Sequence, residues 1–144
     1  MKYEKVYNLS KRFGPPNWNL RSAELADEWG DGTHAKRPID HKVPEDVSRE
    51  DFDYYGSVYF HMEVEDLLFY LYPIAIEYSK DKSFDVVEDF VAALNCKLSE
   101  KIDVLTEEDI EALKEGVDWI FHLHDINDEE WFNCYLGKEL LDKR

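Results

Sequence analysis

Apolar side chains recur at helical spacing along most of the chain after residue 48. Between Val58 and Ser79 one helix face is formed by Val64, Leu67, Leu68, Leu71, Ala75 and Tyr78. Pro73 lies inside this segment, and a proline removes a backbone donor and collides with the preceding helical turn. We therefore expect either a kink or two short helices that meet near Tyr72.

The clearest helix is predicted from Thr106 to Leu123. Thr106 and Asp109 have capping-box spacing, and Leu105 before the cap is placed to contact Ile110. At about 100° per residue, a broad apolar arc is formed by Ile110, Ala112, Leu113, Gly116, Val117, Trp119, Ile120, Phe121 and Leu123. An arc this wide predicts packing on two sides, so we expect this to be the central helix. The opposite, solvent-facing stripe consists of Glu111, Glu115, Asp118 and His122.

Shorter helices are indicated by start and stop signals elsewhere. Ser48 and Asp51 resemble a capping box for a helix that Gly56 can close. Two further helices are expected over Phe84–Leu94, capped by Ser83 and stopped at Asn95, and over Asp128–Leu141.

The N-terminal third contains most of the breaker residues. The run Gly14-Pro15-Pro16-Asn17 predicts an extended arm over residues 1–21. Ser22 is expected to cap a short helix, Ala23–Trp29, which Gly30-Asp31-Gly32 ends. Residues 30–47 are expected to form an ordered loop, with Ile39–Val43 as the only segment that suggests a strand. The prediction is one all-α domain of five or six short helices, with an N-terminal arm, helix and loop over 1–47 and an acidic helical body over 48–144.

Charge is distributed unevenly along the 144 residues. The net charge is −16; residues 1–48 carry eight basic and eight acidic side chains, and residues 49–144 carry nine and 25. Such an excess disfavours direct binding to nucleic acids or anionic membranes. Two interpretations remain: solvated acidic faces on ordinary helices, or an acidic surface that meets a basic protein.

Cysteine and hydropathy patterns suggest a cytoplasmic protein. Cys96 and Cys134 are too few for a disulfide framework and do not form a CxxC motif. The first residues lack the apolar core of a signal peptide, and no window approaches 18 uninterrupted apolar residues.

Residues with catalytic or metal-binding chemistry form no established motif. His122 and His124 point about 200° apart on a helix and cannot share a metal ion, and no glycine-rich phosphate loop is present. We therefore expect no cofactor, metal ion or catalytic residue. The alternative is a small enzyme or metal-binding protein, which would require His34, His41 and His61 to converge with carboxylates in a pocket.

Eight aromatic residues lie between Phe52 and Tyr72, where they form either core or an interaction surface. The favoured function is a non-catalytic module that binds a basic protein partner, with aromatic anchors and acidic rim residues. The candidate binding residues are Tyr54, Tyr55, Tyr59, Tyr70, Tyr72, Glu111, Glu115 and Asp118.

Two segments resemble a widespread bacterial family of small proteins of unknown function. The first is Ser57–Pro73, SVYFHMEVEDLLFYLYP, which has a hydrophobic run, an acid-led helix start and a Tyr-Leu-Pro motif that is here interrupted by Tyr72. The second, Leu105–Leu113, is similar to the helix start that follows in that family. The resemblance implies a helical fold and no catalytic residue. In general type, small acidic bacterial proteins of this kind are also similar to immunity proteins that neutralise toxins.

Overall fold

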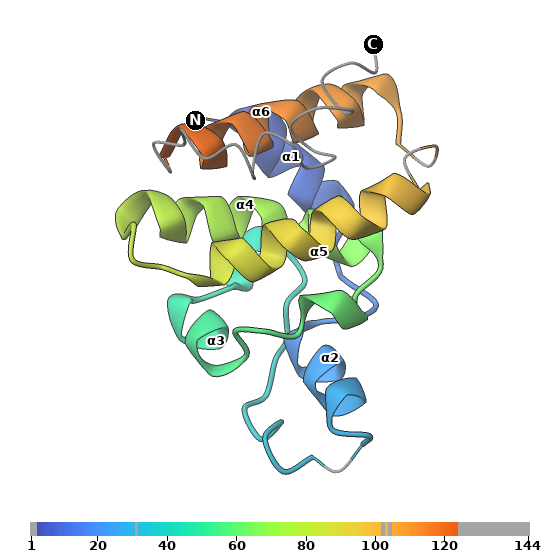
Figure 1. Cartoon of the computed structure of the whole chain (residues 1–144), viewed down its shortest axis with the longest axis vertical. Coiled ribbons are helices and arrows are strands. Elements are labelled where there is room, and N and C mark those ends of the chain that lie inside the picture. Colours follow the sequence, from blue (N-terminus) through green and yellow to red (C-terminus); the bar gives the residue numbers. More distant parts are fainter. Residues whose placement is uncertain (1–2, 31, 102, 104, 124–144) are drawn as a thin grey trace.

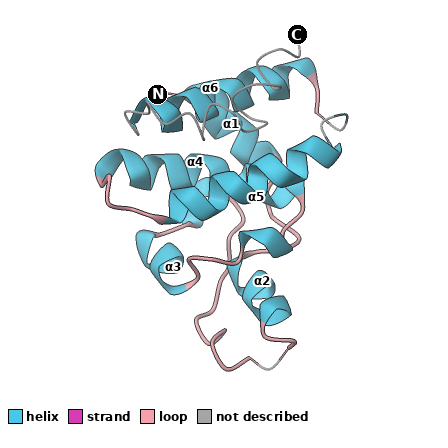
Figure 2. Cartoon of the chain, viewed as in Figure 1, coloured by secondary structure: helices cyan, strands magenta, loops and turns pink. Residues whose placement is uncertain are grey.

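The computed structural model describes residues 3–30, 32–101, 103 and 105–123, and helices are the regular secondary structure of this part of the chain. This part contains six α-helices, two short 3-10 helices and no strand (Figure 2). The elements are α1 (Glu4–Arg12), α2 (Leu20–Asp27), η1 (Pro44–Asp46), α3 (Arg49–Tyr54), η2 (Tyr59–His61), α4 (Val64–Lys80), α5 (Val86–Lys101) and α6 (Glu107–Leu123). The all-α prediction is confirmed, and the suggested strand at Ile39–Val43 does not form.

Helix α4 is the centre of the molecule. It contacts α1, α5, α6 and η1, and eleven of its 17 residues are buried. Figure 1 shows α1 and α6 above α4 and α5, with α2 and α3 below them. The prediction that α6 is the central helix is therefore wrong. A wide apolar arc allows two-sided packing, but α4 is apolar around more of its circumference and is enclosed by more neighbours.

Helix α6 does pack on two sides, as its apolar arc predicts. It contacts both α1 and α4, and Gly116 lies where they meet. A Cβ at Gly116 would lie 3.0 Å from Leu71 of α4 and 3.3 Å from Val6 of α1. The predicted cap is also present, because the Thr106 N–H donates to Asp109 Oδ2 at 2.9 Å and the Asp109 N–H donates to Thr106 Oγ1 at 3.2 Å.

Pro73 lies within one continuous helix, so the alternative of two short helices is wrong. The Ser10 hydroxyl, from α1, donates to the Leu68 carbonyl at 2.8 Å and accepts from the Tyr72 N–H at 3.0 Å. A regular helix would pair these two backbone groups with each other. Ser10 therefore satisfies α4 one residue before the proline and fixes α1 against it.

The N-terminal segment differs from the predicted extended arm. Residues 4–12 form α1 because the breaker residues begin only at Gly14 and because Val6, Leu9 and Ser10 provide a buried face. Helix α2 begins at Leu20, before the predicted start, since Asn19 rather than Ser22 is the cap and accepts from the Ser22 N–H at 2.8 Å.

Helix α3 begins directly after its predicted Ser48 cap, whereas both ends of α5 differ from the prediction. Helix α5 begins at Val86 and continues past Asn95 to Lys101, because asparagine only weakly disfavours a helix and Leu98 extends the buried face. The helix predicted over Asp128–Leu141 lies outside the described residues.

Three helices of the body begin with the same device, an aspartate at the third helical position. Asp51, Asp66 and Asp109 are the buried carboxylates of the described chain. In each, Oδ2 accepts the N–H of the residue that caps the helix; these residues are Ser48, Glu63 and Thr106.

The same three carboxylates also bind the first 48 residues. Oδ1 of Asp66 accepts the N–H groups of Asn17 and Trp18 at 2.9 and 3.2 Å, and Oδ1 of Asp109 pairs with Arg12. Asp51 binds Arg37 and His41. The N-terminal third is thus attached to the body at the starts of α3, α4 and α6.

Candidate functional site

The five candidate tyrosines occupy different environments. Tyr55, Tyr59 and Tyr70 are buried and are unavailable to a partner at the surface. Burial raises the pKa of Tyr59 well above its usual value, and its hydroxyl has no hydrogen-bond partner among the described residues. Tyr72 is half-buried and stacks edge-on against Tyr7 at 5.2 Å between ring centroids. Only Tyr54, at 47% exposure, lies openly at the surface.

The candidate acidic residues all lie on α6. Glu111 is exposed and forms an ion pair with Lys5 of α1 at 3.7 Å, whereas Glu115 is half-buried. The side chain of Asp118 lies outside the described part of the chain. The tyrosines and these acids therefore do not form one continuous surface of exposed residues.

The three histidines do not build a shared site. His41 is buried, with 2% of its side chain exposed, whereas His34 and His61 are exposed. His61 pairs with Asp27 at 3.0 Å, and the His34 N–H donates to Glu28. In the described ranges no three His, Cys, Asp or Glu side chains are grouped so that they could hold a metal ion.

His41 belongs to a buried chain of polar groups that runs from α3 to α4. Asp51 accepts from Arg37 Nε at 2.8 Å, and its Oδ2 lies 2.8 Å from His41 Nε2. The other ring nitrogen, Nδ1, lies 2.8 Å from the Tyr70 hydroxyl, which accepts from the Leu20 N–H at 3.2 Å. Burial alone would raise the pKa of Asp51, but the Ser48 amide, Arg37 and His41 outweigh it and lower the pKa.

One proton arrangement satisfies every group in this chain. A neutral His41 that carries its proton on Nε2 donates to Asp51 and accepts the Tyr70 proton on Nδ1. The Tyr70 hydroxyl then still accepts from Leu20. An aspartate, a histidine and a hydroxyl in series are also the parts of a nucleophilic site. Tyr70 is fully buried, however, so this arrangement joins α2, α3 and α4 rather than facing a substrate.

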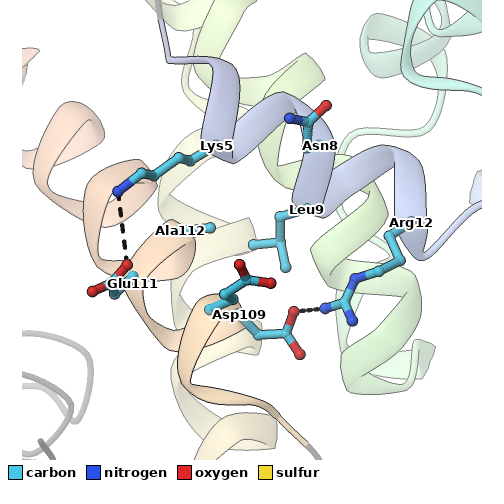
Figure 3. Close-up of a pocket in the computed structure, with 8 residues that line it drawn as sticks. Lys5, Asn8, Leu9, Arg12, Asp109, Glu111 and Ala112 are labelled. Atoms are coloured by element: carbon cyan, nitrogen blue, oxygen red, sulfur yellow. Dashed lines mark ion pairs between the residues drawn. The ribbon is translucent and has the colours of Figure 1, made fainter.

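A pocket of 270 Å³ lies between α1 and α6. Figure 3 shows Lys5 and Arg12 reaching from α1 toward Glu111 and Asp109 of α6, with Leu9 and Ala112 between the two ion pairs. Because its charged walls already pair with each other, this pocket offers a ligand few unsatisfied groups.

The most exposed aromatic side chains lie elsewhere, beside α2 and η2. Trp29 is 96% exposed and Phe60 is 53% exposed. Trp29 is two residues beyond Asp27 of α2, and Phe60 directly precedes His61 of η2. Since Asp27 and His61 are in contact, the two aromatic residues flank the place where α2 and η2 meet.

Two carboxylates of α2 and that of its C-cap residue lie near this place. We define the α2–η2 surface as Glu24, Asp27, Glu28, Trp29, Phe60 and His61. None of its three carboxylates forms an ion pair with a lysine or arginine of the described chain; Asp27 pairs with His61 alone. Burial raises the pKa of Glu24, and the nearby charges of Glu28 and Asp27 raise it further, against the opposite influence of His34 and His61. Glu28 is less accessible, because its Oε1 accepts the His34 backbone N–H and its Oε2 is buried without a hydrogen-bond partner among the described residues. The accessible negative charge of the surface is therefore that of Glu24 and Asp27, which no lysine or arginine of the described chain neutralises.

Trp29 occupies a position that usually belongs to glycine. The Trp29 N–H donates to the Ala26 carbonyl and the Gly30 N–H donates to the Leu25 carbonyl, which is the pattern of a Schellman C-cap. The residue at that cap is left-handed, and Trp29 has φ +59°. A non-glycine residue there is disfavoured by about 1 kcal/mol, and an exposed ring recovers no packing energy.

Sequence reasoning missed this surface. It treated Trp29 as the last residue of a helix and looked for anchors only from Phe52 onward. The Gly30-Asp31-Gly32 stop was visible in the sequence, and a tryptophan directly before a helix stop is a signal that could have identified an exposed ring.

No described helix is both long and apolar enough to cross a membrane. The resemblance to a bacterial family stays a prediction. Comparison with protein-family models, curated proteins and solved structures found no match for this chain.

Proposed function

We propose that this protein is a non-catalytic binding module that engages a basic protein partner, as inhibitors and immunity-type proteins do. The observation that carries the proposal is the α2–η2 surface, where two exposed aromatic residues lie next to the contact of α2 with η2 and where Glu24 and Asp27 have no lysine or arginine partner in the described part of the chain. Affinity in protein interfaces comes mainly from a few aromatic anchors, and surrounding charge governs partner choice and association rate.

The acidic body supports the same proposal over a longer range. The exposed acids that the structure describes there are Glu50, Asp53, Glu63, Asp85, Glu88, Asp89, Glu100, Asp103, Glu107, Glu108 and Glu111. At physiological ionic strength, charge is screened over about 8 Å, so these residues guide the approach of a basic protein but contribute little once it is bound. Tyr54 of α3, which is 47% exposed, is a second and smaller anchor.

Capture with matched variants tests this function. The wild-type protein, the double variant Asp27→Asn/Phe60→Ala and the control Asp40→Asn/Trp18→Ala are immobilised and exposed to an extract of the source organism at about 50 mM and about 500 mM salt. The control also removes one charge and one exposed ring. The proposal expects a basic protein that wild type and control retain and the α2–η2 variant loses, with weaker capture at high salt.

The captured protein is then purified and its binding is measured directly. A dissociation constant that rises at least about tenfold in the α2–η2 variant corresponds to the loss of about 1.4 kcal/mol and supports the proposal. Capture of an acidic protein, or equal binding by all three proteins, contradicts it.

A further inference from the structure

The α2–η2 surface contains two of the three parts of an arginine-binding arrangement that this chain already uses internally. Arg49 lies with its guanidinium carbon 4.5 Å from the centre of the Phe84 ring. Its nitrogens pair with Asp53 at 3.0 Å and with Asp81 at 3.3 Å. A guanidinium thus lies against an aromatic face and between two carboxylates, which is the geometry that its planar, delocalised charge favours.

The α2–η2 surface has the same two kinds of side chain, aromatic rings and carboxylates, but no cation from the described chain. Trp29 and Phe60 provide exposed aromatic faces, and Glu24 and Asp27 provide the accessible negative charge. The described chain supplies no arginine or lysine that pairs with these carboxylates. From this difference we infer, on the basis of the proposed function, that the surface binds an arginine side chain of the basic partner, stacked on Trp29 or Phe60 and paired with the carboxylates of α2.

The backbone at Trp29 supports this assignment independently. Its left-handed conformation with φ +59° suits glycine better than tryptophan. A residue that breaks a local rule and is 96% exposed has no stabilising role in packing, and such conflicts concentrate at functional positions. A ring held away from the body in this way is free to receive a planar cation on its face.

A comparison of an arginine peptide with a lysine peptide of equal charge separates the contribution of ring stacking from that of charge. The probes are a glycine–arginine repeat peptide and a glycine–lysine repeat peptide of equal length and charge, both fluorescently labelled, and binding is followed by anisotropy. A cation placed over the face of a tryptophan ring gains about 1 kcal/mol of binding free energy. The planar guanidinium stacks on such a ring better than the ammonium does, so the gain favours the arginine peptide. The expected result is a preference of about fivefold for the arginine peptide by the wild-type protein.

Trp29→Gly is the informative variant because glycine fits the backbone at this position, so the fold is retained. We expect it to bind both peptides equally, with a stability at least equal to that of the wild type. Trp18→Ala, which removes another exposed ring at the opposite end of α2, serves as the control and should keep the arginine preference. Asp27→Asn should weaken binding of both peptides.

The outcomes distinguish this inference from the proposed function. Loss of the preference in Trp29→Gly, together with its retention in Trp18→Ala, supports arginine recognition. Equal binding of the two peptides by the wild type overturns arginine recognition, even where Asp27→Asn weakens both; in that case the proposed binding of a basic protein stands. A preference that persists in Trp29→Gly and in Phe60→Ala overturns the assignment to these rings.

Discussion

The starts of α3 and α4 each hold part of the N-terminal third through a buried aspartate, but the pKa values of the two aspartates are shifted in opposite directions. Asp51 and Asp66 both cap their own helix and both hold part of the N-terminal third. Asp51 has two cationic or proton-donating side chains as partners, Arg37 and His41, and its pKa is lowered. Asp66 binds only backbone N–H groups; burial raises its pKa, and the amides of Trp18, Glu63 and Asn17 oppose this only in part.

At Asp66, hydrogen bonds from backbone amides do not outweigh the burial of the carboxylate. Asp66 accepts three amide hydrogen bonds and its charged form is still disfavoured, since desolvation is the larger effect. At Asp51 desolvation is outweighed by the Ser48 amide, Arg37 and His41 together, so the pKa is lowered instead. The connection at α3 is therefore expected to be a strong ionic one, and the connection at α4 a weaker one that depends on backbone geometry.

The largest effect is expected from Asp51→Ala. This variant leaves His41 buried without its partner and frees Arg37, and breaking such a pair costs about 3 kcal/mol of unfolding free energy when one partner is partly exposed. Urea denaturation measures the loss. Asp53→Ala, two residues away on the same helix, removes only an exposed pair with Arg49 and should cost under about 1 kcal/mol. Equal losses would contradict the ionic role of Asp51.

A smaller loss is expected from Asp66→Ala. The N–H groups of Asn17, Trp18 and Glu63 lose their acceptor, but the variant also removes a carboxylate whose charge is disfavoured by burial. We expect about 2 kcal/mol by the same measurement. Glu65→Ala, at the neighbouring position, is the matched control. A loss at Asp66 larger than that at Asp51 would reverse the comparison.

The stability contributions of Asp51 and Asp66 are expected to change in opposite directions as the pH falls. The folded pKa of Asp51 is below the usual 3.8, so its contribution is complete above pH 3.8 and disappears as the pH falls through the lowered value. The folded pKa of Asp66 is above 3.8, so the cost of its charge disappears as the pH falls through the raised value. Unfolding curves at several pH values should show the stability advantage of wild type over Asp51→Ala shrinking in acid. The advantage over Asp66→Ala should grow. The same trend in both pairs would be inconsistent with opposite pKa shifts.

The smallest loss of unfolding free energy is expected at Ser10, whose neutral hydroxyl connects α1 to α4. Ser10→Ala removes the hydroxyl that joins the Leu68 carbonyl to the Tyr72 N–H, and one buried hydrogen-bonding group is worth about 1–2 kcal/mol. Ser79→Ala, whose exposed hydroxyl donates to the Ile76 carbonyl within the same helix, should change the unfolding free energy by less than about 0.5 kcal/mol. In contrast to the aspartates, the Ser10→Ala loss should not vary between pH 3 and pH 7, which thermal unfolding at both values would reveal.

The sequence by itself determined where two of the helices begin and which face of α6 is buried. The capping pairs Ser48–Asp51 and Thr106–Asp109 placed the starts of α3 and α6, and the apolar arc of α6 predicted its two neighbours. The all-α class followed from the same periodicity. These predictions succeeded because a cap or a helix face depends only on residues within one or two turns.

Only the tertiary structure decided what each of these residues does beyond its own helix. Asp51 reads as a cap in the sequence, but its partners Arg37 and His41 lie 14 and 10 residues away. The glutamate cap before Asp66 gave no recognised signal. Tyr54 and Tyr55 are adjacent in sequence, and one is exposed while the other is buried. Burial and pairing depend on how distant segments pack, and the candidate surface around Trp29 and Phe60 exists only because α2 and η2, some thirty residues apart, meet through Asp27 and His61.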